Sequence, residues 1–348
     1  MLGTNIGIDL GTTSIIIYVK GKGVVLNEPC AAAYDTQTNK LIAVGKRAYD
    51  MHEKAPDTIR VVKPMVHGIV SDFTATKHIL RHFLSKICKN MVFKPNAVIC
   101  VPSMVTSLEK RTILDLITAS GAAKACLIEE PLAAALGAGI KNDRPVGTMV
   151  VDIGGGTTDI AVITMGCISV SQSLKIAGNA LNEAIQRQIR RERDVIIGEK
   201  TAERIKKEIG CSFLRDVELG ITVKGKHFIT GMPVSIEVTS TEAYLAMRPQ
   251  LEQIVEAVRS VLEMTPPELA ADIMTSGIYL TGGGALLNGI DKLIEERTGI
   301  KTVVADEAVN CVALGTGEAL AHMDILSQNG YVFKARDEIG GLEVDKTE

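Results

Sequence analysis

The sequence predicts an α/β protein of two related lobes, each built on a mixed β-sheet of about five strands with flanking helices. A short motif occurs twice: residues 6–14 read IGIDLGTTS and residues 149–159 read MVVDIGGGTTD. Strand-like apolar runs alternate with helical patterns in both halves of the chain, which is typical of α/β architecture. At 348 residues the chain is also long enough for two domains.

Each copy of the motif predicts a β-hairpin. An apolar run ends in Asp, a glycine-containing turn and paired hydroxyls follow, and a second apolar run returns. Turn amides and hydroxyls suit phosphate oxygens, and the carboxylates of Asp9 and Asp152 suit a hydrated Mg²⁺. The sequence therefore predicts a magnesium nucleotide held in a cleft between the two lobes.

The remaining elements of the first half are marked by their end signals. A strand-rich stretch runs to Gly45, and segment 63–72 is expected to be a loop because it contains proline and glycine. Asp72 can cap a helix over 74–88, where apolar residues recur at four-residue spacing. The later expected elements are a strand at 97–101, a helix opened by a Thr106–Glu109 capping box and closed by Gly121, a strand at 124–129 and a helix from Pro131 to Ala138.

The second half begins after the linker 141–147. A long amphipathic helix is predicted over 241–264, and Pro249 should kink or restart it because proline lacks the amide donor. A strand at 278–280 leads into the glycines of 282–284 and then a helix. The other expected elements are helices at 182–193 and 201–209, short strands in 219–238 around turns at 224–226 and 231–233, and a helix capped by Thr265 and Pro266.

These elements give the expected domains. Lobe I covers 1–145 and is rejoined by 312–335, lobe II covers 146–311, and 336–348 form a disordered tail. With a net charge of −3, the composition gives no electrostatic footprint for nucleic acid, so no such partner is expected. The first strand follows almost directly on the start, and no apolar run reaches membrane-spanning length, so a cytoplasmic protein is expected.

A third glycine turn, TGGGALLNG at 281–289, joins the two hairpin motifs. The three together resemble the phosphate and adenosine motifs of the ATPase superfamily of actin, DnaK-type chaperones and sugar kinases. Three further strings, LIEEPLAAALGAG (127–139), GEKTAERIKKEIG (198–210) and EMTPPELAADI (263–273), resemble the bacterial actin family of MreB and Mbl. The resemblance spans about residues 5–325.

The resemblance implies an actin-like fold in which each lobe carries a smaller subdomain and the central cleft holds ATP and Mg²⁺. It also implies slow ATP hydrolysis, self-assembly into paired protofilaments, and guidance of the cell-wall elongation machinery from the inner face of the cytoplasmic membrane. Asp9 and Asp152 would organise the metal through waters. The implied nucleotide contacts are Thr12, Thr13, Ser14, Gly154, Gly155, Gly156, Thr157, Glu203, Lys206, Gly282, Gly283, Gly284 and Ala285.

Two catalytic residues are implied in the same way. Glu130 would orient the attacking water, with Thr158 beside it. On its own residues, Glu130 is equally a carboxylate that favours the start of a helix through the macrodipole.

The lysine-flanked residues Met91, Val92 and Phe93 resemble the membrane-inserting loop of the family, and lysines attract anionic lipid. A hydrophobic contact at a helix end is the alternative interpretation.

Some positions depart from the family pattern. Met104 replaces a usual Gly, Asn179 and Asn182 replace usual Asp residues, Asp159 stands where many members have Glu, and Pro249 interrupts a usually continuous helix. Two other functions stay open: a small-molecule kinase on the same core and, because of Asn179 and Asn182, a filament scaffold that has lost hydrolysis. Pelleting with ATP, Mg²⁺ and liposomes, together with phosphate release, would separate the three.

Overall fold

The computed structural model describes residues 5–88, 94–140, 144–320 and 333–334. The chain forms two compact units, named lobe I and lobe II below. Lobe I comprises Met1–Arg144, Met165–Cys167 and Asn310–Glu348, and lobe II comprises Pro145–Thr164 and Ile168–Val309.

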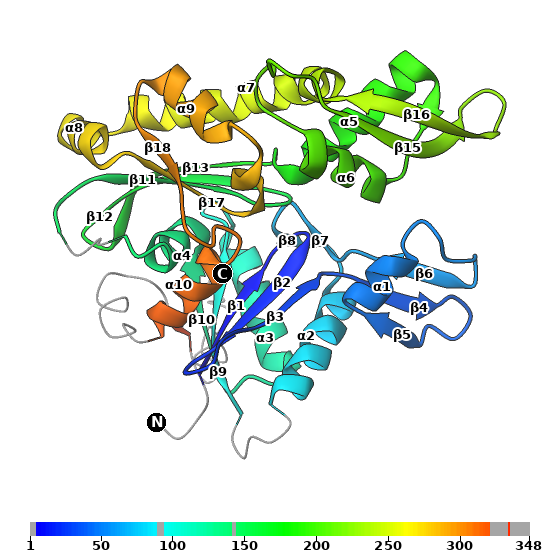
Figure 1. Ribbon diagram of the computed structural model, residues 1–348. Helices are drawn as coiled ribbons and strands as arrows, with labels where there is room; N and C mark the ends of the chain where they lie inside the picture. The colour runs from blue at the N-terminus through cyan, green and yellow to red at the C-terminus, as the bar shows by residue number, and fades with distance from the viewer. Residues whose placement is uncertain (1–4, 89–93, 141–143, 321–332, 335–348) are drawn as a thin grey trace, which may run out of the picture. The chain divides into compact units, whose positions relative to one another are not determined.

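Lobe I is built on a mixed sheet with the strand order β19-β10-β9-β1-β2-β3 (Figure 1). Strands β1, β9 and β10 are parallel, β2 is antiparallel to β1, and β3 is antiparallel to β2. The sheet therefore contains the expected five strands and a sixth strand, β19, at its edge. The bounds are β1 (Asn5–Leu10), β2 (Ser14–Val19), β3 (Gly23–Pro29), β9 (Asn96–Val101), β10 (Lys124–Glu129) and β19 (Phe333–Lys334).

Lobe II repeats this arrangement with the order β13-β12-β11-β17-β18. Strand β11 takes the place of β1, with β12 antiparallel on one side and β17 parallel on the other. The doubled motif is therefore a duplication of the central sheet. The bounds are β11 (Thr148–Ile153), β12 (Thr158–Thr164), β13 (Cys167–Leu174), β17 (Ile278–Thr281) and β18 (Thr302–Val304).

Helices and a small sheet complete each lobe (Figure 1). Lobe I contains α1 (Lys46–Met51), α2 (Phe73–Ile87), α3 (Ser107–Ser120), α4 (Glu130–Gly137), α10 (Cys311–Ala319), a sheet of β4 (Ala32–Asp35), β5 (Leu41–Val44) and β6 (Ile59–Val62), and the hairpin β7 (Met65–Val66) and β8 (Ile69–Val70). Lobe II contains α5 (Gly178–Arg193), α6 (Glu199–Ile209), α7 (Ser240–Met264), α8 (Pro267–Ser276), η1 (Gly283–Leu286), α9 (Ile290–Thr298) and a sheet of β14 (Val195–Ile196), β15 (Gly220–His227) and β16 (Pro233–Thr239).

Several expected helix ends are confirmed by their hydrogen bonds. The Asp72 carboxylate accepts from the Ala75 amide at the start of α2. Thr106 and Glu109 form the predicted capping box of α3, which ends at Gly121. Each cap satisfies amides that a helix start leaves without an intrahelical partner.

Two expectations about local structure are wrong, and of the kink or restart expected at Pro249 the restart does not occur. Segment 63–72 contains the hairpin β7–β8, whose turn residues His67 and Gly68 both have positive φ. Residues 224–226 lie within β15, where Gly225 is needed because a Cβ there would overlap Val195 and the Ile196 carbonyl. Helix α7 is not restarted at Pro249 and runs unbroken for 25 residues.

The unbroken course of α7 has a packing cause. Residues on both sides of its proline, including Met247, Leu251, Ile254 and Val258, are buried in one apolar core of lobe II. Burying this face outweighs the hydrogen bond that the proline removes. A separate difference concerns helix α5, which begins at Gly178, four residues before its expected start at Asn182.

Close helix packing fixes α4 in lobe I. A Cβ on Gly137 of α4 would overlap the Cys311 carbonyl of α10, and a Cβ on Gly315 of α10 would overlap the Ala133 carbonyl of α4. The two helices therefore approach backbone to backbone. Glu130 is the first residue of α4 and is buried. Among the described residues, no helix is long and apolar enough to cross a membrane.

Candidate functional site

The two hairpin turns have the same geometry. Turn 1 (Gly11–Ser14) joins β1 to β2 and is closed by a 2.9 Å hydrogen bond from the Gly11 amide to the Ser14 carbonyl. Turn 2 (Gly154–Thr157) joins β11 to β12 and is closed by the same bond, also 2.9 Å, from Gly154 to Thr157. This register makes Asp9 and Asp152 equivalent, each two residues before its turn.

In lobe I, Asp9 lies half-buried at the end of β1. The Cys100 thiol on the neighbouring strand β9 donates to its Oδ1 at 3.4 Å. Burial raises the pKa of Asp9 to about 6, and the thiol hydrogen bond acts in the opposite direction. The protein alone therefore stabilises the negative charge of Asp9 poorly. A nearby cation would stabilise that charge.

Turn 1 is supported by a contact that the sequence did not reveal. The Gly68 amide, at the tip of hairpin β7–β8, donates to the Thr12 hydroxyl at 2.8 Å. The Thr13 carbonyl accepts from the Cys30 amide, and the Thr13 side chain is exposed. The only sequence signal for the Gly68 contact is the His-Gly pair, which is suited to a tight turn.

Glu130 is 7% exposed at the start of α4, directly after β10. Its neighbour Glu129 instead points to Lys110, with 3.6 Å between Oε1 and Nζ. The Glu130 charge helps to raise the pKa of the buried Cys100 thiol, the residue that contacts Asp9. Glu130 therefore belongs electrostatically to the surroundings of Asp9.

In lobe II, turn 2 rests on the segment that starts α5. The amides of Gly178 and Asn179 donate to the carbonyls of Gly154 and Gly155 at 3.1 and 2.8 Å. The buried Thr158 hydroxyl donates to the Ile176 carbonyl at 2.7 Å. These three bonds hold the backbone of turn 2 and fix the orientation of the Thr158 side chain.

The third glycine turn lies against the same strand end. The Thr281 hydroxyl donates to Asp152 Oδ1 at 2.8 Å, and both residues are buried. A Cβ on Gly282, which has φ of +81°, would meet that same carboxylate oxygen at 2.8 Å. Lobe II therefore brings Asp152, turn 2 and the third glycine turn together.

The surroundings constrain the residue type at positions 283 to 285 to different degrees. A Cβ on Gly284 would overlap the Ile153 side chain, and Ala285 is buried. Gly283 is exposed and nothing lies within 4 Å of a Cβ placed on it. Neither crowding nor a positive φ demands glycine at this position, so the backbone is open for a ligand to approach.

Helix α6 supplies the two remaining expected residues. Lys206 Nζ donates to the Gly178 carbonyl at 2.8 Å. Burial lowers the pKa of Lys206 to about 8, opposed by the charge of Glu203. Glu203 forms an ion pair with Lys207, with 2.6 Å between Oε1 and Nζ. The structure thus connects Lys206 to turn 2 through the backbone of Gly178.

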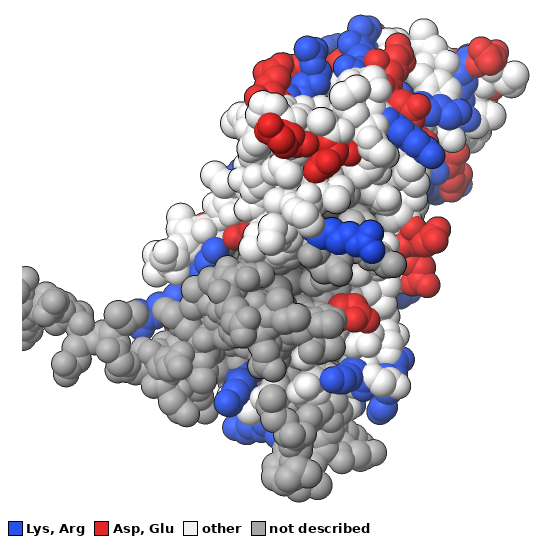
Figure 2. Space-filling model, turned by 90° about the vertical axis from the view of Figure 1, so that its left-hand side faces the viewer, with Lys and Arg blue, Asp and Glu red and all other residues white. Residues whose placement is uncertain are grey.

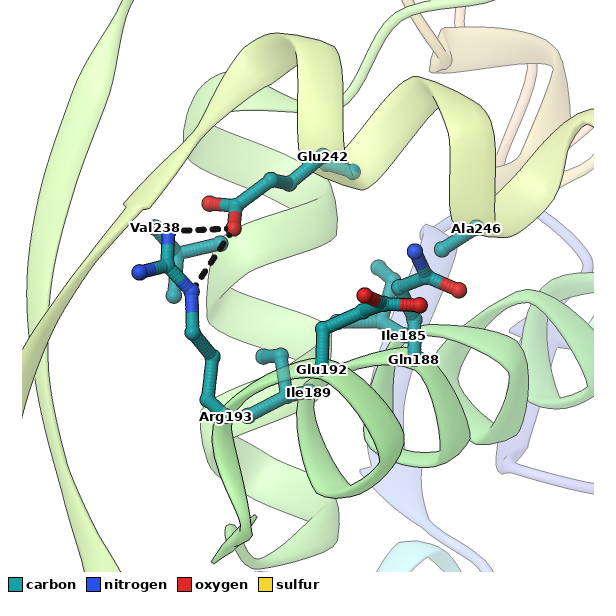
Figure 3. Close-up of a pocket in the computed structure, with 9 residues that line it drawn as sticks. Ile185, Gln188, Ile189, Glu192, Arg193, Val238, Glu242 and Ala246 are labelled. Carbon is teal, nitrogen blue, oxygen red and sulfur yellow. Dashed lines mark hydrogen bonds and ion pairs between the residues drawn. The ribbon is translucent and has the colours of Figure 1, made fainter.

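A small separate pocket lies between α5, β16 and α7 (Figure 3). Its floor is apolar, and Arg193 at its rim donates to Glu242 at 2.6 and 3.0 Å. None of the expected site residues lines this pocket.

Among the described residues, no group of three His, Cys, Asp or Glu side chains could hold a metal ion. Met91, Val92 and Phe93 lie outside the described residues. In the upper part of the face shown in Figure 2, basic and acidic side chains are interspersed.

Comparison with known proteins agrees with this geometry. A model of the MreB/Mbl protein family matches residues 3–328. The chain is 45% identical over 327 residues to the cell shape-determining protein Mbl of Bacillus subtilis (strain 168), covering 94% of this chain and 98% of Mbl. It is 42% identical over 331 residues to the cell shape-determining protein MreB of Escherichia coli (strain K12), covering 93% and 95%.

Solved structures give the same result. MreB5 of Spiroplasma citri bound to ADP superposes with a TM-score of 0.89 at 40% identity, covering 94% of this chain and 99% of MreB5. The same protein bound to AMPPNP gives 0.88 at 39% identity, covering 95% and 99%. A MamK double helical filament, at 20% identity and a TM-score of 0.79, shares the fold. With a family model matching almost its whole length, this chain has the actin-like fold and belongs to the MreB/Mbl family.

Proposed function

We propose that this protein binds ATP with Mg²⁺, hydrolyses the ATP slowly and assembles into filaments that determine cell shape. The observation that carries the proposal is the pair of turns with identical closing bonds, each preceded by an aspartate. Relatives about 40% identical were solved with ADP and AMPPNP, which supports a nucleotide as the ligand.

One nucleotide would take its phosphate contacts from both turns. Thr12, Thr13 and Ser14 would contribute from turn 1, and residues 154–157 from turn 2. The nucleoside would contact Glu203, Lys206 and the third glycine turn, Gly282 to Ala285. The open backbone at Gly283 supports this assignment, because a side chain there would fill the space that the nucleoside needs.

The two aspartates fit a magnesium ion held through waters. Asp152 keeps one oxygen bonded to Thr281 and is held in one orientation by it. Asp9 has a raised pKa that a nearby cation would lower. Since no cluster of three acidic or sulfur ligands occurs among the described residues, phosphate oxygens and water would complete the coordination. The ion would neutralise phosphate charge during phosphoryl transfer.

Glu130 and Thr158 would act on the attacking water. Glu130 is buried at the start of α4, which close packing against α10 holds in place. From that position its carboxylate would accept a hydrogen bond from the attacking water. Thr158 already donates its proton to Ile176, so its oxygen can only accept a hydrogen bond from that water.

The test compares Glu130→Gln with the matched control Glu129→Gln. We expect Glu130→Gln to bind ATP as the unmodified protein does and to release phosphate about 100-fold more slowly. Glu129 pairs with Lys110, so its substitution should leave phosphate release unchanged. Equal phosphate release from all three proteins, each binding ATP, would remove Glu130 from the mechanism. No phosphate release from an unmodified protein that binds ATP would instead support the scaffold alternative that Asn179 and Asn182 keep open.

Self-assembly would be driven by exposed apolar surface. Met104 and Leu108, at and before the start of α3, are 68% and 75% exposed. These two side chains lie four residues apart in the sequence, and we assign a subunit contact to them. Sedimentation with ATP and Mg²⁺ tests the assembly. A small-molecule kinase on the same core would stay in the supernatant.

The filaments would lie at the inner face of the cytoplasmic membrane, making the protein cytoplasmic and peripheral, and would guide the cell-wall elongation machinery. Met91, Val92 and Phe93 would enter the bilayer, and each subunit's weak contact would be multiplied along a filament. Replacing Met91 and Phe93 with Ser should release filaments from anionic liposomes. Retained binding would place the contact elsewhere.

A further inference from the structure

Turn 2 is connected to helix α6 by a chain of three hydrogen-bonding groups. Lys206 Nζ donates to the Gly178 carbonyl at 2.8 Å, and the Gly178 amide donates to the Gly154 carbonyl at 3.1 Å. Residue 178 is therefore held on one side by α6 and on the other holds the first residue of turn 2.

The chain of bonds leaves little room for a side chain at position 178. A Cβ there would lie 3.2 Å from Lys206 Nζ and 3.3 Å from the Gly154 carbonyl oxygen. A side chain would therefore press on both links at once. The next amide, that of Asn179, donates to Gly155 and extends the same support by one residue.

We propose that Lys206 is a positioning residue for turn 2, acting through Gly178, in addition to any contact with the nucleoside. This inference rests on the proposed nucleotide binding and deepens it. The lysine would couple the helix beside the nucleoside to the turn that holds the phosphates. Lys206 would then set the preference for triphosphate over monophosphate, which a contact to the nucleoside alone cannot do.

The environment of Lys206 agrees with a positional role. Its ammonium is largely removed from water, and burial lowers its pKa to about 8. Its neighbour Lys207 is exposed and paired with Glu203. A buried ammonium that donates to a backbone carbonyl is held in one place, because losing that bond would leave the charge unsolvated.

Hydrogen exchange of the nucleotide-free protein tests the support directly. In Lys206→Met we expect the amides of Gly178 and Asn179 to exchange about fivefold to tenfold faster, the effect of losing one hydrogen bond. Lys206→Arg keeps a charged donor and should restore most of the protection. Lys207→Met is the matched control and should exchange as the unmodified protein does.

Nucleotide affinities provide the second readout. We expect Lys206→Met to weaken ATP binding about fivefold more than AMP binding. Gly178→Ala leaves the lysine in place and should shift the same ratio in the same direction. Unchanged exchange at Gly178 and Asn179, or equal weakening of ATP and AMP in both variants, would overturn the inference. Failure of the unmodified protein to bind either nucleotide would overturn the proposed function instead.

Discussion

The sharpest prediction concerns Asp9, because the free-energy cost of ionising its carboxylate in the folded protein can be calculated. Burial raises its pKa from 3.8 to about 6. At 1.36 kcal/mol per pH unit, keeping Asp9 ionised at pH 7.5 costs the nucleotide-free protein about 3 kcal/mol. The folded state binds the proton more tightly than the unfolded state, so stability falls as the pH rises from about 4 through 6.

Replacing the carboxylate with an amide removes this cost. We expect Asp9→Asn to raise the free energy of unfolding of the nucleotide-free protein by about 3 kcal/mol at pH 7.5, and by only about 2 kcal/mol at pH 5. The amide oxygen can still accept the Cys100 thiol, so that contact is kept. Denaturant unfolding at the two pH values measures both numbers.

Ligand should reverse the order of stability. With Mg²⁺ and ATP, the unmodified protein should gain more stability than Asp9→Asn, because only the carboxylate can bind the waters of a cation strongly. Asp216→Asn, at an exposed position outside the proposed site, is the control and should leave both the stability and the gain with ligand unchanged. If Asp9→Asn without ligand is less stable than the unmodified protein, the reasoning about Asp9 is refuted. It is also refuted if the increase in the free energy of unfolding is as large at pH 5 as at pH 7.5.

Three shorter predictions concern packing, the support of turn 1 and assembly. Gly315→Ala should destabilise lobe I by about 2 kcal/mol or more, because its methyl group would overlap the α4 backbone; normal stability in denaturant would contradict that close approach. Thr12→Val removes the acceptor for the Gly68 amide and should weaken ATP binding about fivefold in a titration, whereas unchanged affinity would separate that contact from the ligand. Leu108→Asp should keep ATP binding and lose sedimentation of filaments; normal sedimentation would move the contact away from α3.

The sequence predicted elements whose signals are local. The hairpin turns, the caps at Asp72 and Thr106, and strand β10 follow from residues next to one another in the chain, and the structure has them at or near the expected positions. Turn chemistry and capping need no distant partner, so a single sequence is enough to predict them.

The missed features depend on residues far apart in the chain. Gly225 was assigned to a turn, but its glycine is required by the neighbouring strand β14. Pro249 does not restart α7 because burial on both sides of it decides the outcome. The contacts from Gly68 to Thr12 and from Lys206 to Gly178 span 56 and 28 residues, and no local pattern encodes them.

The central claim is that both turns bind the phosphates of one ATP. The most direct measurement is a calorimetric titration of the nucleotide-free protein with ATP and Mg²⁺, repeated for Ser14→Ala in turn 1 and Thr157→Ala in turn 2. The account predicts one ATP per chain, with either substitution weakening that single binding event by about tenfold. Two independent sites, or an affinity that only one of the substitutions changes, would contradict it.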